Sequence, residues 1–105
     1  PEGSMSTGIE AIAAERRRQI EVEGWTPEHD DQNHDGDMSR AAACYALSAA
    51  GYGSDDRIML RFWPWVTRWW TPKSRRVDLI RAGALIVAEI DRLDRAAVRE
   101  AETSN

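Results

Sequence analysis

Acidic residues and histidines are concentrated in one segment, Glu23 to Asp37, with the sequence EGWTPEHDDQNHDGD. The stretch from Asp31 to Gly36 matches the first half of a calcium-binding loop, in which alternate oxygen ligands converge on a cation and a glycine permits the turn. The second half of that loop is missing, because Ala42 stands where a bidentate glutamate is needed. One interpretation is therefore a divalent cation, held by the oxygen atoms of Asp31, Asn33 and Asp35.

Two further interpretations of this acidic segment stay open. Imidazoles at His29 and His34, with the neighbouring aspartates, offer the mixed nitrogen and oxygen ligands that suit zinc or manganese in a hydrolase. Alternatively, Asp and Asn form turns, Asp37 caps the following helix, and the remaining charge is solvated. The sequence alone does not choose among the three.

A second candidate site lies in residues 62–76, FWPWVTRWWTPKSRR, which combine aromatic rings with cations. Aromatic faces stack on nucleobases, and arginines bind phosphates through two parallel hydrogen bonds. The start of a following helix adds free N–H groups that favour an anion. With the tryptophan of the acidic segment, the candidate ligand-binding residues are Trp25, Trp63, Trp65, Arg68, Trp69, Trp70, Lys73, Arg75 and Arg76. The alternative is that the tryptophans close one end of a helical bundle while the basic and acidic segments pair.

An enzyme is not favoured by the arrangement of reactive side chains. The serines lie at expected helix ends, without a histidine and an acid in a recognisable motif. Magnesium-dependent pyrophosphohydrolases of the all-α type need carboxylates on two helices, and the expected second helix offers none beyond its cap. A divalent cation is thus the one cofactor that we keep as a possibility.

Length and charge restrict the class of protein. The chain has 105 residues, a net charge of -4 and a pI near 5.1, so it fits one domain with no general attraction to nucleic acid. No apolar run approaches the about 20 residues of a membrane-spanning helix, and Cys44 is a lone cysteine in an alanine-rich stretch where we expect burial. We expect a cytoplasmic protein with neither a membrane partner nor a sequence-specific nucleic-acid partner. Residues 1–4, PEGS, are typical of a cloning leader, which leaves a single helical domain over residues 5–105.

The hydrophobic pattern predicts a mainly α, compact three-helix domain. The first helix starts at a capping box over Thr7–Glu10 and stops near Gly24. The second covers about Met38 to Ala50, with Asp37 as its cap. A tryptophan-rich irregular connection follows, in which residues 58–62 suggest a short strand.

The third helix is predicted to begin at the cap Thr71, with Pro72 in its first turn, and to reach about Glu100 before a frayed tail from about residue 101. Apolar residues at steps of three or four predict one continuous core-facing side, formed by Val77, Ile80, Ala84, Val87, Ile90, Leu93 and Ala97. Further apolar residues widen this side, namely Leu79, Ile86 and Val98. A helix of this length favours a homo-oligomer in which a second copy covers part of it.

Several motifs, in order ERRRQIEVEGWTPEHDD, AAACYA, WPW and WWTPKSRRVDLIRAGALIVAEIDRLDR, resemble a family of small proteins of tailed bacteriophages and prophages. More distantly, Arg16 to Asp31, with EGWT at Glu23–Thr26, is similar to the ryanodine-receptor-type repeat domain, and RRVDLIRAGALIVAEI is similar to that domain's closing helix. The second resemblance implies binding of a nucleotide-derived ligand.

These features together favour a phage-encoded, non-enzymatic binding protein that sequesters a nucleotide-derived immune signal of the host. One alternative is an acidic inhibitor that docks on a basic host protein, which charge reversal at Asp30, Asp31, Asp35 and Asp37 would test. Another is a metal-dependent nucleotide hydrolase built on the acidic segment.

Overall fold

The computed structural model describes residues 6–53 and 55–104, so the leader assigned to residues 1–4 lies outside the described part. A mainly helical fold is confirmed, and the described residues contain no strand. Five α-helices are present in these residues, with one π-helical turn, η1, and one 3-10 turn, η2. Their bounds are α1 Gly8–Glu21, α2 Pro27–Asp30, α3 Asp37–Leu47, η1 Ser48–Tyr52, α4 Asp56–Phe62, η2 Thr67–Trp69 and α5 Arg75–Thr103.

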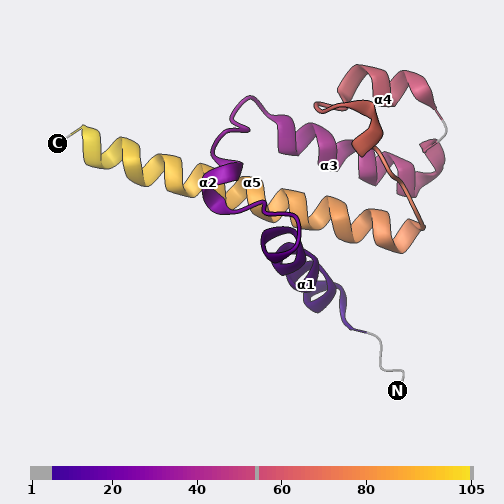
Figure 1. Ribbon diagram of the computed structural model, residues 1–105, viewed down its shortest axis with the longest axis horizontal. Helices are drawn as coiled ribbons and strands as arrows, with labels where there is room; N and C mark the ends of the chain where they lie inside the picture. Colours follow the sequence, from indigo (N-terminus) through magenta and orange to yellow (C-terminus); the bar gives the residue numbers. More distant parts are fainter. Residues whose placement is uncertain (1–5, 54, 105) are drawn as a thin grey trace.

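The long helix α5 organises the fold (Figure 1). Helix α1 crosses one side of it, α3 lies along the other side, and α4 lies beyond α3. The C-terminal part of α5 extends past the rest, so the radius of gyration is 15.1 Å, where about 13 Å is usual for this length. None of the described helices is both long enough and apolar enough to cross a membrane.

The prediction of three helices missed two short ones, α2 and α4. Helix α2 begins at Thr26, whose hydroxyl accepts a hydrogen bond from the backbone N–H of His29, and Pro27 fits its first turn. Residues 58–62, predicted as a strand, lie in α4, which the Asp55 carboxylate caps. Short helices of this kind are fixed by their caps and by tertiary packing, which an apolar period does not reveal.

The predicted caps have mixed outcomes. The capping box of α1 is confirmed, since Thr7 and Glu10 exchange hydrogen bonds of 2.8 and 3.2 Å. Asp37 is not the cap of α3. The N-cap is Gly36, at φ 81°, and the Asp37 carboxylate pairs with Arg40 instead.

The start of α5 was also predicted wrongly, because Ser74, and not Thr71, is its N-cap. The buried Asp78 carboxylate accepts a hydrogen bond of 2.8 Å from the Lys73 backbone N–H and another of 2.9 Å from the Ser48 hydroxyl. Arg81 donates to the Thr71 carbonyl oxygen at 2.6 Å. These bonds hold residues 71–74 as a non-helical strap across the first turns of α5.

Alanines form much of the interface between α3 and α5. Ala41, Ala82 and Ala88 are at most 4% exposed, and such small side chains let the helix backbones approach closely. Around them lie the larger buried residues Met38, Tyr45 and Leu85. Cys44 is 1% exposed, which confirms its predicted burial, and burial raises the pKa of its thiol.

The predicted core-facing side of α5 is wrong for its largest members. Val87, Ile90 and Leu93 are 37%, 51% and 51% exposed, as are Ile86 and Leu79 at 50%. The physical reason is steric, because close helix contacts select the alanine-rich side of α5 and leave the aliphatic side outside. No second chain is present, so a homo-oligomer over this side stays a prediction.

Candidate ligand-binding pocket

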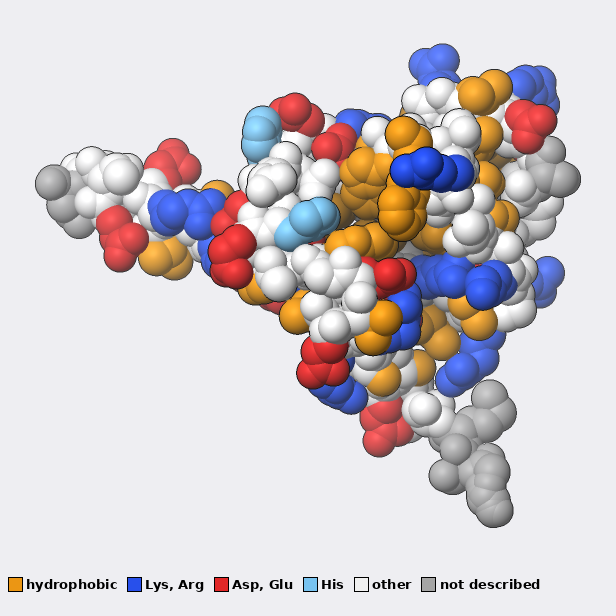
Figure 2. All heavy atoms as spheres, viewed as in Figure 1, with side chains coloured by type: hydrophobic (Ala, Val, Ile, Leu, Met, Phe, Trp, Pro, Cys, Tyr) orange, Lys and Arg blue, Asp and Glu red, His pale blue; other side chains and the backbone are white. Residues whose placement is uncertain are grey.

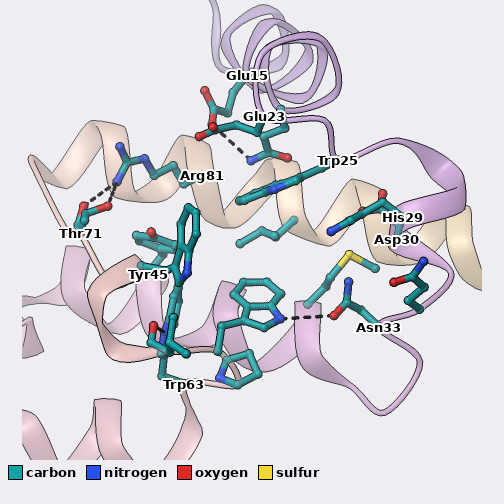
Figure 3. A pocket seen from close by; sticks show the side chains of 18 of the residues that line it. Glu15, Glu23, Trp25, His29, Asp30, Asn33, Tyr45, Trp63, Thr71 and Arg81 are labelled. Atoms are coloured by element: carbon teal, nitrogen blue, oxygen red, sulfur yellow. Dashed lines mark hydrogen bonds and ion pairs between the residues drawn. The ribbon is translucent and has the colours of Figure 1, made fainter.

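A pocket of about 900 Å³ opens between the end of α1, the segment before α2, and the tryptophan-rich segment. Figure 2 shows hydrophobic side chains gathered at the centre of this face with Lys or Arg beside them. Aromatic rings supply much of the lining and charged groups stand among them (Figure 3). Of the residues proposed from the sequence to bind a ligand, the lining includes Trp25, Trp63, Trp65, Arg68 and Trp69.

The indole rings form one continuous wall. Trp65 lies at the centre, with its ring centroid 6.2 Å from that of Trp25 and 5.3 Å from that of Trp63. Trp70 lies outside the lining and packs on Trp63 and Tyr45 at centroid distances of 5.0 Å each. The tryptophan cluster as a whole therefore packs against the core, and its members Trp25, Trp63 and Trp65 also line the pocket.

Internal hydrogen bonds orient two of these indoles. The Trp65 N–H donates to the Asn33 side-chain oxygen at 3.3 Å, and the Trp63 N–H donates to the Val66 carbonyl at 3.0 Å. Both indole N–H groups are thus occupied within the protein. What remains for a ligand is the π surface of the rings, which favours stacking over polar recognition.

Trp25 is held in place by the motif that contains it. Gly24 adopts φ 77°, a left-handed conformation that suits glycine, and turns the chain after α1. The backbone N–H of Trp25 then donates to the backbone carbonyl of Gln19 at 2.9 Å, while the Arg16 side chain donates to the Trp25 carbonyl at 3.3 Å. Arg16 also pairs with Asp30 at 2.5 Å, and this buried ion pair anchors α2 to α1.

Burial changes the pKa of Asp30. It raises the pKa of this carboxyl group above its ordinary value, and the opposing effect of Arg16 does not fully offset it. Asp30 also lines the pocket, at the end that Figure 3 shows away from Arg81. The Asp30 carboxylate therefore stabilises the fold through its ion pair with Arg16.

The α1 side of the pocket carries an internally neutralised group. Arg18 donates two hydrogen bonds to the Glu15 carboxylate, at 2.8 and 2.9 Å, and reaches Glu23 at 3.5 Å. Burial tends to raise the pKa of Glu15, but hydrogen bonds from Arg18 and then Gln19 outweigh it and leave the pKa below its ordinary value. The charge of Arg18 is accordingly balanced by Glu15 and Glu23, which leaves little attraction for a ligand anion.

Two other guanidinium groups in the lining differ from Arg18. Arg81 donates to the Thr71 carbonyl at 2.6 Å and lies 5.5 Å from the centroid of the Tyr45 ring. Arg68 lies 5.8 Å from the centroid of the Trp69 ring. Within the described part of the chain, neither forms an ion pair with a carboxylate. The charge of Arg81 also acts on Glu15, whose pKa it helps to lower, while Arg68 lines the pocket beside Trp69.

The remaining predicted cations lie elsewhere. Lys73, Arg75 and Arg76 are exposed around the start of α5 and do not line the pocket. Arg76 donates to the Ser6 carbonyl at 3.2 Å. Among the described residues these cations form no ion pair with the acidic segment, in which Asp30 pairs with Arg16 of α1 and Asp31 with arginines much further along α5.

The acidic segment is largely engaged in such pairs. Asp31 accepts hydrogen bonds from Arg95 at 2.8 Å and Arg99 at 3.3 Å, and the bond from Arg95 is the main reason that its pKa is lowered. His34 and Asp35 contact each other at 3.0 Å on the surface. Among residues 6–53 and 55–104, no three His, Cys, Asp or Glu side chains are grouped to hold a metal ion. A cation held by Asp31, Asn33 and Asp35, or by His29 and His34, stays a prediction.

Sequence reasoning did not identify several lining residues, among them Gln19, Tyr45 and Arg81. Arg81 lies two turns into α5, inside a helix whose charges resemble an ordinary solvated face. Gln19 precedes Trp25 by six residues, and the turn of the chain at Gly24 brings the two side by side. No local spacing signals either position.

Comparison with protein-family models, curated proteins and solved structures yields no match to this chain. The resemblance to phage proteins and to the ryanodine-receptor-type repeat consequently stays a prediction. The pocket geometry is the observation from which a function is argued.

Proposed function

We propose that this protein is a non-enzymatic binder of a nucleotide-derived ligand, which stacks against the indole wall and directs phosphate towards Arg68 and Arg81. The observation that carries the proposal is a pair of guanidinium groups beside the aromatic lining that form no ion pair with a carboxylate of the described residues. The volume of about 900 Å³ lies within the range of about 300–1,000 Å³ that is usual for small-molecule sites.

Stacking accounts for the base. Trp25 and Trp65 are half-buried, and Trp69 is 52% exposed at the pocket, so their faces remain open to a planar ring. Each stacked base contributes about 1–3 kcal/mol in proteins that bind single-stranded nucleic acid. An aromatic wall accepts any base and thus supports affinity more than selectivity.

Charge accounts for the phosphate. A guanidinium group forms strong, paired hydrogen bonds with phosphate oxygens, and its cost of burial is lower when it already stacks on an aromatic ring. Arg81 and Arg68 both have such a ring, Tyr45 and Trp69 respectively. Glu15 and Glu23 line the α1 side of the pocket and are paired with Arg18, so their charge is already balanced within the protein.

Binding without turnover is supported by the state of the carboxylates. Glu15 and Asp30 are each engaged by an arginine, which suits a structural role better than proton transfer. The ion pairs of Asp30 and Asp31 likewise favour the pocket over an acidic docking surface, because reversing these charges would disturb folding directly. The phage resemblance supports a ligand that is a host immune signal, withdrawn by sequestration.

The test is a thermal-shift screen followed by calorimetry. The panel contains linear and cyclic mono- and dinucleotides, ADP-ribose-type compounds, and divalent metals with a chelator control. A ligand at 100 times its Kd stabilises the protein by about 2.7 kcal/mol, a shift of several degrees for a domain of this size. Ligand recovered after heat denaturation is then analysed by mass spectrometry. Intact ligand agrees with sequestration, whereas a converted product would establish an enzyme, and a panel without any nucleotide shift would contradict the proposal.

A further inference from the structure

One polar atom at the pocket has no partner among the described residues. The side-chain oxygen of Gln19 is buried without a hydrogen bond to any of them, in a residue that is 2% exposed and lines the pocket. Most buried polar atoms in folded proteins are paired, and a buried oxygen that has lost its water costs free energy. Such an atom beside a pocket indicates where a ligand supplies the missing donor.

The neighbouring glutamate fixes which end of the amide faces it. The Gln19 Nε2 group donates to the Glu15 carboxylate at 3.2 Å (the bond is drawn in Figure 3). Turning the amide over would place its oxygen against a carboxylate that has a lowered pKa and is therefore ionised at neutral pH. The amide oxygen is consequently held away from Glu15 and can accept a hydrogen bond from a ligand.

We infer that Gln19 selects a ligand whose base carries an exocyclic amino group, such as an aminopurine. This inference rests on the proposed function. Glu15 and Glu23 line this end of the pocket as well, with Arg18 paired to both, so the Gln19 oxygen is the acceptor there for which the described residues supply no donor. The Gln19 oxygen is covered in the free protein, so its partner arrives with a ligand that enters beside Trp25 and displaces the lining slightly.

The direction of the ligand agrees with this assignment. Figure 3 shows Arg81 at one side of the pocket and Glu15 and Glu23 above Trp25 on the α1 side. An aminopurine nucleotide has the same polarity, with donors on the base edge and negative charge on the phosphate. Stacking on Trp25 places the base between the two groups, so a single pose satisfies the acceptors and the guanidinium groups together.

The experiment compares two ligands that differ in one group. Calorimetry measures the Kd of an adenine nucleotide and of the analogue with unsubstituted purine, with the same ribose and phosphates. Wild type is expected to prefer the amino-bearing ligand by at least about tenfold, because its loss leaves the glutamine oxygen unpaired. Gln19→Leu should bind the two ligands with equal Kd. Gln32→Leu, which changes an exposed glutamine of the same pocket, should keep the preference.

Each outcome decides something. Equal binding of both ligands by wild type, or an unchanged preference in Gln19→Leu, overturns the role of Gln19 while nucleotide binding itself stands. Absence of binding by every nucleotide overturns the proposed function as well. Gln19→Leu removes the unpaired oxygen together with the hydrogen bond from Nε2 to Glu15, so circular dichroism and the Tm of the free variant check that it is folded. If Gln19→Leu does not fold, Gln19→Met, which keeps the side-chain length, takes its place in the same comparison.

Discussion

Two groups of cations lie close in the sequence and differ in their surroundings. Arg68 and Arg81 line the pocket, and each lies over an aromatic ring. Lys73, Arg75 and Arg76 fall between them in the chain, yet they are exposed around the start of α5. From the sequence, the second group is the denser and the more suggestive of a phosphate site. The structure places the first group at the pocket, with Arg81 half-buried and Arg68 exposed beside Trp69.

The difference shows what makes a cation a binding group. A guanidinium in open solvent is hydrated and screened by salt, so it contributes little to the affinity for a small ligand. Beside a wall of indoles, water is partly excluded and the same charge acts more strongly on an anion. The strap of residues 71–74, held by Asp78 and Arg81, is what separates the two groups.

Loss of a pocket guanidinium should have the largest effect on ligand binding. We expect Arg81→Ala to weaken binding of a nucleotide by about 2 kcal/mol, roughly 30-fold, because a charge-assisted hydrogen bond to phosphate is removed. Calorimetry with the best ligand of the screen measures the change. Arg81→Lys keeps the charge without the planar fork and should lie between wild type and Arg81→Ala.

Because Arg81 also forms a hydrogen bond with Thr71, the folding of the Arg81→Ala variant must be checked separately. Circular dichroism and the Tm of the free protein show whether Arg81→Ala is still native. A native Arg81→Ala protein that binds as tightly as wild type would remove the distinction between the two cation groups.

Two adjacent tryptophans allow a sharper version of the comparison. Trp69→Ala should weaken binding by about 1–2 kcal/mol and leave the Tm nearly unchanged, because this ring is 52% exposed and lines the pocket. Trp70→Ala should lower the Tm instead, since its ring packs on Trp63 and Tyr45. Thermal unfolding and calorimetry of both variants measure the split. The same loss of binding in both, at equal Tm, would contradict it.

Guanidinium groups with carboxylate partners should act on stability and not on binding. Asp31→Asn removes the partner of Arg95 and Arg99 at the surface of α5, and we expect a loss of about 1 kcal/mol or less at pH 7. The pKa of Asp31 is lowered in the folded protein, so its contribution is complete above the ordinary aspartate pKa of about 4. The contribution fades as the pH falls through the lowered value.

Urea unfolding of wild type and Asp31→Asn across pH 2 to 7 tests this sign, with the difference expected to vanish at the acid end. A difference that grows at low pH would contradict the assignment. Ligand affinity at pH 7 should be the same in both proteins, because Asp31 is not part of the pocket lining.

Local signals in the sequence were sufficient for some elements. The capping box of Thr7 and Glu10 and the burial of Cys44 follow from residue types at short range, and both are confirmed. The aliphatic period of α5 misled because it shows that one side is apolar, not which side is covered. Close alanine contacts with α3 decided that, and these depend on two helices at once.

The pocket shows the same limit. Trp65 and Trp69 were recognisable as candidates because tryptophans cluster in residues 63–70, and Trp25 because it lies in the acidic segment. Gln19 and Arg81 were not recognisable. The backbone hydrogen bond with Trp25 places Gln19 at the pocket, and the bond with Thr71 of the strap positions Arg81. The ion pairs of the acidic segment were missed for the same reason, because Asp30 finds its partner fourteen positions away and Asp31 finds its own on α5.

The smallest expected effect belongs to the exposed cations at the start of α5. Replacement of both Arg75 and Arg76 by alanine should change the Kd of a bound nucleotide by less than about twofold at physiological salt, since both lie outside the pocket and charge at this distance is screened. Removing positive charge from the first turn should also stabilise α5 slightly, because cations there oppose the helix dipole. Calorimetry at two salt concentrations compares this double variant with Arg81→Ala. A larger loss of binding than that caused by Arg81→Ala would move the phosphate site to the helix start and reverse the comparison between the two groups.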